Sequence, residues 1–253
     1  DHAGNVEESR TALVRIDRLD PVTYLDLPTA GWSSTPVTVT LRPTDAGSGV
    51  ATTRYRVGSG TPRYAPSPDP LSFQVADEGT STIEYSSTDN VGHRETTASA
   101  VVKVDTSDPW VTFGNLPTDW VNHPVTLTVE AHDAVSGPDA LFIRGQEVWE
   151  DHWRPSPAEY VVGWEGQTIV RAWARDRAGR TSERDSFALV YIDRTPPTSH
   201  AHGAPATWAR NATVTIDMED AGVEDCSATY ELDGGSTQTY GSGIDLATDG
   251  LHW

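Results

Sequence analysis

Aspartates gather in three short segments, IDRLDPV, VDTSDPW and IDRTPPT, and are the residues best suited to chemistry. Calcium takes six to eight oxygen ligands, which carboxylates and carbonyls supply. The spacing matches no fixed calcium-binding loop, and the third segment has Pro196 where the others have a second aspartate. Ordinary surface charge is the alternative interpretation. Calcium is therefore a hypothesis, and its five candidate ligands are Asp17, Asp20, Asp105, Asp108 and Asp193.

A second candidate site is a tryptophan-rich stretch between residues 141 and 164. Exposed aromatic rings can stack on a sugar ring. The same rings can also cover a long hairpin inside a β-sandwich, because large aromatic side chains usually bury most of their area. Packing is the favoured interpretation, and carbohydrate stacking stays open as the other. The four residues concerned are Trp149, Trp153, Tyr160 and Trp164.

The sequence contains no familiar catalytic pattern. HExxH, GxSxG and metal-binding Cys/His spacings do not occur among the 253 residues. The single cysteine, Cys226, follows Glu224 and Asp225, and neighbouring negative charge disfavours the thiolate that a nucleophile needs. We therefore predict that the chain is not an enzyme.

Charge and composition restrict the partners and the cellular location. Lys and Arg number 18 against 37 Asp and Glu, so the net charge is −19. Such a chain repels nucleic acid and anionic membranes, and it attracts cations. No apolar stretch is long enough to span a membrane. An acidic β-protein with one cysteine cannot form an internal disulfide framework, and it fits a bacterial extracellular or cell-surface product.

The elements that would position these residues are short β-strands. Stretches such as VTVTL, VTLTV and ATVTI alternate with period two, and 21 Gly and 17 Pro suit many turns. Tyr55 and Val57 should share one face of their strand, and Ile83 and Tyr85 should point inward. In the first repeat we expect strands near 22–27, 37–42, 52–57, 71–75, 81–87 and 98–104, with a candidate short strand near 63–65.

An internal repeat of about 88 residues organises the whole chain. The step of 88 relates Asp17 to Asp105 and Asp193, and it also relates Trp32 to Trp120 and Trp208. Two turn motifs follow the same period: DAGSGV at Asp45 matches DAVSGP at Asp133, and DNVGH at Asp89 matches DRAGR at Asp176. In both motifs we expect the aspartate to accept backbone N–H groups and the glycine to supply a positive φ. We expect the three tryptophans to pack in the core.

These markers predict four segments. Residues 1–17 are the closing strand of a preceding repeat, 18–105 and 106–193 are whole repeats, and 194–253 is a repeat that lacks its last strands. We favour a longer array of repeats as the reason for the two ends. The alternative is strand exchange, in which residues 1–17 complete the third domain of another copy. The proline-bearing linkers predict a semi-rigid arrangement.

The motif order W-x-x-x-P-V-T-V-T, D-A-G-S-G-V, Y-R-V and E-G-x-x-x-I-E-Y-x-S-x-D-N-x-G resembles the Ig-like tandem repeats of large bacterial surface and exported proteins. The resemblance covers nearly the whole chain and implies an all-β fold of tandem immunoglobulin-like β-sandwiches. It implies a non-catalytic structural or adhesive stalk or filament segment, or else an accessory, carbohydrate-binding region of an exported hydrolase. Expected partners are neighbouring Ig-like repeats of the same or an adjacent chain, and cell-surface or wall polysaccharide.

Overall fold

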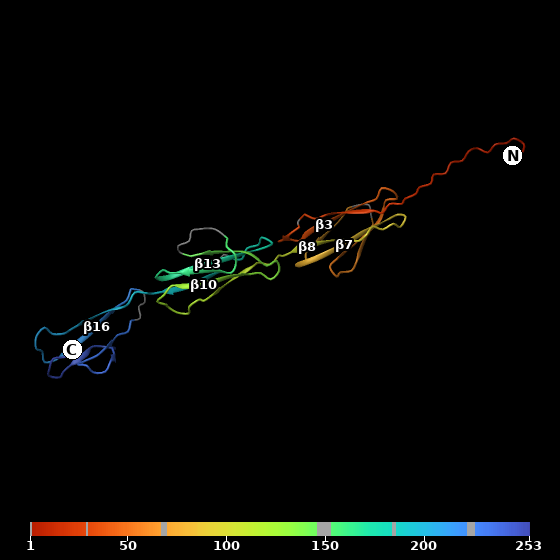
Figure 1. Cartoon of the computed structure of the whole chain (residues 1–253). Coiled ribbons are helices and arrows are strands. Elements are labelled where there is room, and N and C mark those ends of the chain that lie inside the picture. Colours follow the sequence, from red (N-terminus) through yellow and green to blue (C-terminus); the bar gives the residue numbers. More distant parts are fainter. Residues whose placement is uncertain (1, 29, 67–69, 146–152, 184–185, 222–225) are drawn as a thin grey trace. The chain divides into compact units, whose positions relative to one another are not determined.

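The computed structural model of the chain is built from β-strands and connecting turns (Figure 1). It describes the chain except for residues 1, 29, 67–69, 146–152, 184–185 and 222–225. The part of the chain so described holds no helix that is long and apolar enough to cross a membrane. The all-β prediction is confirmed, and the strands form the paired sheets of immunoglobulin-like β-sandwiches.

Two sheets with a shared core make up the first sandwich. One sheet has the strand order β1-β3-β6, and the other has the order β2-β8-β7-β4-β5. Neighbouring strands pair antiparallel, except for the parallel pair of β2 and β8. The strands are β1 (Val22–Asp26), β2 (Trp32–Ser33), β3 (Val37–Thr44), β4 (Val50–Val57), β5 (Arg63–Pro66), β6 (Leu71–Val75), β7 (Gly79–Asp89) and β8 (Ala98–Val104). All seven strands expected here, including the short one near 63–65, are confirmed.

Period-two alternation explains why these residues form strands around this core. Along β3 every second side chain is buried, so that Val39 and Leu41 are fully inaccessible, while Thr38 and Thr40 alternate with them on the outer face. Ile83 and Tyr85 of β7 complete the core from the other sheet, as predicted. Tyr55 also points inward and stacks on Phe73 with ring centroids 4.3 Å apart.

The second sandwich repeats this plan with fewer strands. Its sheets have the orders β12-β10-β9 and β11-β13-β14. Its core includes Leu127, Leu141 and Ile143, and Phe142 stacks on Trp173 with ring centroids 3.8 Å apart. The strands are β9 (Trp110–Gly114), β10 (Val125–His132), β11 (Pro138–Arg144), β12 (Ala158–Val162), β13 (Gly166–Asp176) and β14 (Phe187–Ile192).

The last repeat forms two smaller sheets, β15-β16-β19 and β17-β18. Its strands are β15 (Thr198–His202), β16 (Ala212–Glu219), β17 (Thr229–Tyr230), β18 (Gln238–Thr239) and β19 (Ile244–Leu246). The side chains of β16 alternate between half-buried and exposed. Among the described residues after Asp193 none is buried, so this repeat has the alternation of a sandwich without its closed core.

By their internal contacts the residues fall into two compact units. The first contains residues 1–110 together with 131–140 and 174–183, which carry the DAVSGP and DRAGR turns. The second contains residues 111–130, 141–173 and 184–253. Each sheet draws its strands from one of the predicted repeats. The repeat boundaries themselves stay a prediction.

The segment before the first sandwich is extended and exposed. Residues 5–21 form no strand, and Val6, Leu13, Val14 and Ile16 are each more than 70% exposed. A closing strand needs a partner sheet, and the described residues of this segment pair with none. The assignment of 1–17 as a closing strand therefore stays a prediction.

The prediction that the repeating tryptophans pack in the core is wrong. Trp32 is half-buried, Trp120 is 37% exposed and Trp208 is 83% exposed. For Trp32 the reason lies in the position of β2, which is an edge strand that pairs in parallel with β8. A side chain on that edge lies over the end of the sheet, where Lys103 sits 5.9 Å from the centre of the Trp32 ring.

Candidate functional site

The linker aspartates that repeat every 88 residues close the same local turn. In each, carboxylate oxygen Oδ1 accepts the backbone N–H of the residue two positions later. The pairs are Asp17–Leu19, Asp105–Ser107 and Asp193–Thr195, at 3.1, 3.0 and 3.0 Å. The other oxygen of Asp105 accepts the N–H of Ser136 at 2.9 Å, and that of Asp17 accepts the N–H of Ser48 at 2.6 Å. Each of these two linkers is thereby fixed to a DxGSG-type turn.

A glutamate holds the following residues of the linker from another side. Glu78, immediately before β7, accepts the N–H of Thr106 at 2.9 Å and the hydroxyl of Ser107 at 3.0 Å. Hydrogen bonds from the hydroxyl groups of Thr106 and Ser107, and after them the bond from the Thr106 N–H, lower the pKa of Glu78. Glu165, immediately before β13, makes the equivalent bond to the N–H of Arg194 at 3.1 Å. The linker contacts therefore repeat with the sequence.

The DAGSGV and DAVSGP turns adopt the predicted conformation. Asp45 accepts the N–H of Gly49 at 2.7 Å, and Asp133 accepts that of Gly137 at 2.6 Å. The two glycines have φ of 83° and 82°, a region that only glycine enters without strain. These short loops place a carboxylate at a fixed position beside the linker aspartate.

Three carboxylates meet at the second linker. Asp105, Asp133 and Asp176 each offer an oxygen, and these oxygens all lie within 4.8 Å of one another. We call this set the second-linker cluster. Asp105 and Asp176 are buried, at 0% and 1% exposure, while Asp133 is half-buried. All three belong to the first compact unit.

Two oxygens of the second-linker cluster lack a hydrogen-bond partner. These are Oδ2 of Asp133 and Oδ2 of Asp176, and both are buried. Burial raises the pKa of Asp176, and the negative charges of Asp105 and Asp133 raise it further, against a hydrogen bond from the Arg180 N–H. A buried carboxylate next to two others is costly without a compensating positive charge.

The first linker has a different set at the equivalent position. Asp17, Asp89 and His93 lie together, again within 4.8 Å, and we call them the first-linker cluster. Here Oδ2 of Asp89, which corresponds to the unpartnered oxygen of Asp176, lies 2.9 Å from Nδ1 of His93. That hydrogen bond raises the pKa of His93. Burial opposes ionisation of Asp89, but the hydrogen bonds from His93 and the turn N–H groups lower its pKa overall.

Asp17 is also held in its ionised form. Hydrogen bonds from Leu19 and Ser48 lower its pKa from 3.8 to about 2. Both linkers thus present preformed carboxylates that can bind positive charge. At the first linker the His93 ring contacts them, and at the second linker two carboxylate oxygens have no hydrogen-bond partner. Oxygen-only ligands suit a hard cation.

The structure separates the five aspartates predicted as ligands. Asp17 and Asp105 lie in the two clusters, Asp20 is exposed, and Asp193 binds the N–H of Thr195. Asp108 is not in a cluster, because its carboxylate pairs with Arg180 at 2.7 Å. In the described part of the chain, these two clusters are the groups of acidic, His or Cys side chains close enough to hold an ion.

Sequence reasoning missed Asp89, His93, Asp133 and Asp176 as cluster members, because their motifs were explained fully as turns. The available signal was their shared period. The linker aspartate and both turn aspartates recur with steps of 88, 88 and 87 residues, which is expected of residues that meet at one place in each repeat.

The aromatic residues predicted for sugar stacking have different environments. Trp149 lies outside the described residues. Tyr160 is 8% exposed and packs in the second sandwich, so its ring offers no free face. Trp153 is 37% exposed and meets Phe142 edge-on at 6.0 Å, whereas Trp164 is 58% exposed.

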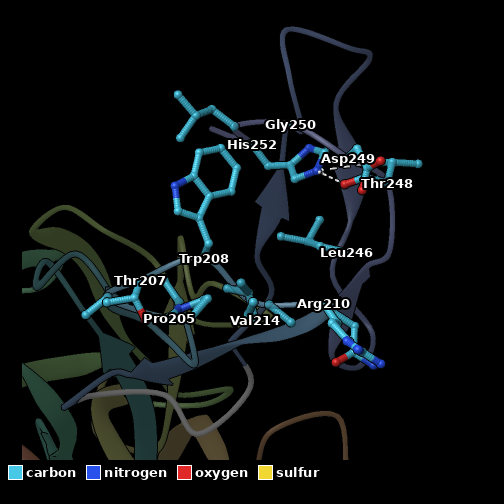
Figure 2. A pocket seen from close by; sticks show the side chains of 16 residues that line it. Pro205, Thr207, Trp208, Arg210, Val214, Leu246, Thr248, Asp249, Gly250 and His252 are labelled. Atoms are coloured by element: carbon cyan, nitrogen blue, oxygen red, sulfur yellow. Dashed lines mark hydrogen bonds between the residues drawn. The ribbon is translucent and has the colours of Figure 1, made fainter.

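A cavity of about 710 Å³ lies in the last repeat, beside Trp208 (Figure 2). Leu246 and Val214 line it with apolar side chains. At its rim the two ring nitrogens of His252 lie at hydrogen-bonding distance from two acceptor oxygens, a carboxylate oxygen of Asp233 at 2.7 Å and the Thr248 carbonyl at 2.8 Å. None of the site residues predicted from the sequence lines this cavity.

Comparison with known proteins finds likeness among solved structures only. No family model matches the chain. No curated protein matches it either. Among solved structures the chain is similar to Clostridium thermocellum CbhA fibronectin(III)-like modules, with 16% identity and a TM-score of 0.36, over 68% of this chain and 94% of that one.

Proposed function

We propose that the chain is a non-catalytic structural segment of a secreted or surface-anchored bacterial protein, in which tandem Ig-like sandwiches serve as a stalk with ordered linkers. One observation carries the proposal: the linker residues are hydrogen-bonded on two sides, and the same contacts recur in successive repeats. Residues 105–107 bond to Ser136 and to Glu78. Glu165 makes the equivalent contact to the next linker.

These hydrogen bonds suit a role in which the linkers hold neighbouring sandwiches at a set spacing. A free linker of four residues would sample many conformations, and each ordered residue loses about 1–2 kcal/mol of backbone entropy. Charge-assisted hydrogen bonds to Glu78 and Asp105 compensate for that loss. The polar side chains that recur with the repeat are engaged with backbone groups of turns and linkers, which is the use expected in a structural array.

A test removes one linker contact and leaves the core intact. In the whole 253-residue chain, Glu78→Gln should speed hydrogen exchange at the amide of Thr106 and broaden the distribution of dimensions seen by small-angle scattering. The matched control is Glu84→Gln, which removes a half-exposed carboxylate paired with Arg56 in the same sandwich. Equal exchange and scattering in Glu78→Gln and the control would refute the structural role of the linker.

Carbohydrate binding by an accessory region is the second candidate, supported by the exposed ring of Trp164. An exposed tryptophan face can stack on a sugar ring through the same contacts that it makes with other rings. Affinity electrophoresis in wall and plant polysaccharides should retard the chain, and Trp164→Ala should abolish the shift. Trp110→Ala is the control, because Trp110 is 48% exposed but stacks on His132. Unretarded migration in every polysaccharide would remove this candidate.

A further inference from the structure

We propose that Asp105, Asp133 and Asp176 bind one calcium ion at the second linker, and that at the first linker the side chain of His93 takes the place of that ion. The inference goes beyond the structural role proposed above, because it assigns a ligand. Its test reads bound metal directly, so a failure would leave the role of the linker hydrogen bonds untouched.

The three carboxylates lie close enough together to share one ion. They come from three separate places in the sequence, namely the end of β8, the turn after β10 and the end of β13. Their ligand oxygens lie within 4.8 Å of one another. Calcium binds oxygen at 2.3–2.6 Å, so oxygens around one ion lie up to about 5 Å apart. One ion can therefore contact all three.

The unpartnered oxygen of Asp176 is a second and independent observation. Asp176 is 99% buried, and its Oδ2 has no hydrogen-bond partner. Buried carboxylate oxygens in folded proteins almost always have a partner, either a donor or a cation. Asp133 contributes a second oxygen of the same kind. Both carboxylates are positioned by backbone N–H groups that bind their Oδ1 atoms, which leaves Oδ2 free for an ion.

The nearby cationic side chains do not neutralise the cluster. Arg180 directs its guanidinium to Asp108 at 2.7 Å, and Arg177 binds the carbonyl of Ser136 at 3.3 Å. Among the described residues, none of the three cluster carboxylates takes part in an ion pair with an arginine or lysine. A cation from outside the chain can supply the positive charge that the second-linker cluster lacks.

The first linker shows what fills the equivalent place. His93 stands at the position of Arg180 in the repeat, after the DxxG motif. Its Nδ1 bonds Oδ2 of Asp89, the counterpart of the unpartnered oxygen of Asp176. The same carboxylate is thus satisfied by an internal group in one repeat and left open in the next. This difference predicts one ion per chain rather than two.

Ligand type and charge select the metal. The second-linker cluster offers oxygen alone, whereas zinc and copper favour nitrogen and sulfur. Magnesium demands near-ideal octahedral geometry and keeps several waters, while calcium tolerates the irregular geometry of three separate turns. Water and backbone carbonyls supply the remaining ligands on the side where Asp133 is half-exposed. The net charge of −19 raises the local cation concentration.

Isothermal titration of the chelator-treated 253-residue chain with calcium chloride tests the proposal. We expect one bound calcium per chain, and a loss of affinity of at least tenfold in both Asp176→Asn and Asp133→Asn. The control is Asp139→Asn, a surface carboxylate of β11 paired with Arg175, which should bind as the wild type does. Circular dichroism checks the fold, and Asp133→Asn, the less buried change, decides the matter if Asp176→Asn does not fold.

Three outcomes would overturn the proposal in whole or in part. No binding at millimolar calcium would reject the site. Binding that neither variant weakens would place the ion elsewhere on the acidic surface. Two bound ions in the wild type, falling to one in Asp133→Asn, would keep the second-linker site and reject the role given to His93.

Discussion

The first and second linkers each bring a linker aspartate close to the aspartate of a DxxG turn, yet they balance the charge differently. At the first linker Asp89 is neutralised by His93, and Asp17 stays half-exposed. At the second linker Asp105 and Asp176 are buried, and the residue equivalent to His93 is turned toward Asp108. One side chain of the DxxG motif thus decides whether a linker is closed internally or left open to a cation.

The largest expected effect separates the two linkers by their response to calcium. Saturating the chain at 100 times the dissociation constant should stabilise the native state by about 2.7 kcal/mol, since the ion binds folded protein only. Thermal melts with calcium and with chelator should therefore differ by several degrees. Hydrogen exchange should place the gain at the turns of Asp133 and Asp176 and leave the turn of Asp89 unchanged. Equal melts would remove the distinction between the linkers.

A glycine at the first linker should produce the next largest effect. A Cβ atom at Gly47 would lie 2.3 Å from the Asp17 carboxylate, so Gly47→Ala should displace Asp17 from the Ser48 N–H. Loss of this hydrogen bond to a charged group should lower the free energy of unfolding. Urea unfolding monitored at the first sandwich gives the value. Gly31→Ala is the control, because a Cβ there meets nothing within 4 Å.

Unchanged stability in Gly47→Ala would mean that Asp17 does not contribute to the fold. The second linker already carries Val135 at the position of Gly47, and there Asp105 still accepts the N–H of Ser136 at 2.9 Å. The prediction therefore applies to the first linker alone, and Val135→Gly should not strengthen the second.

The sequence predicts the features that depend on residues close together in the chain. It does not predict those that depend on tertiary packing. Alternation and turn residues are local, and they predicted the strands of the first repeat and the conformation of the turns at Asp45 and Asp133 correctly. The repeat period also identified Asp17 and Asp105, which both lie in the two clusters. Which turns meet a linker aspartate depends on tertiary packing, so Asp133 and Asp176 were not recognised as ligands. The prediction that Trp208 is buried was wrong for the same reason, because the burial of a side chain depends on the neighbouring strands.

A smaller effect, opposite in sign under two conditions, should follow from Asp176→Asn. Burial and the charges of Asp105 and Asp133 raise the pKa of Asp176, so its ionised form opposes folding at neutral pH. In chelator the variant should be more stable than the wild type by about 1 kcal/mol, the scale of one like-charge contact near 4 Å in water. In calcium it should be less stable. Urea titrations in both buffers measure the crossing, and a variant less stable in both would contradict the repulsion.

The smallest expected effect is a pH dependence confined to the first linker. The hydrogen bond to Asp89 raises the pKa of His93, so folding favours the protonated imidazole. The stabilisation is complete below the unfolded pKa of about 6.5 and is lost as the pH rises through the higher folded value. The side chain of His93 is 36% exposed, which screens the interaction and keeps the effect small.

NMR titration of the His93 ring should give the raised pKa directly, and Asp89→Asn should return it toward 6.5. Hydrogen exchange at the Gly92 amide, which bonds to Asp89, should rise over the same pH range, whereas the amide of Arg180, which bonds to Asp176, should not respond. A parallel response of both amides would show that His93 does not distinguish the two linkers.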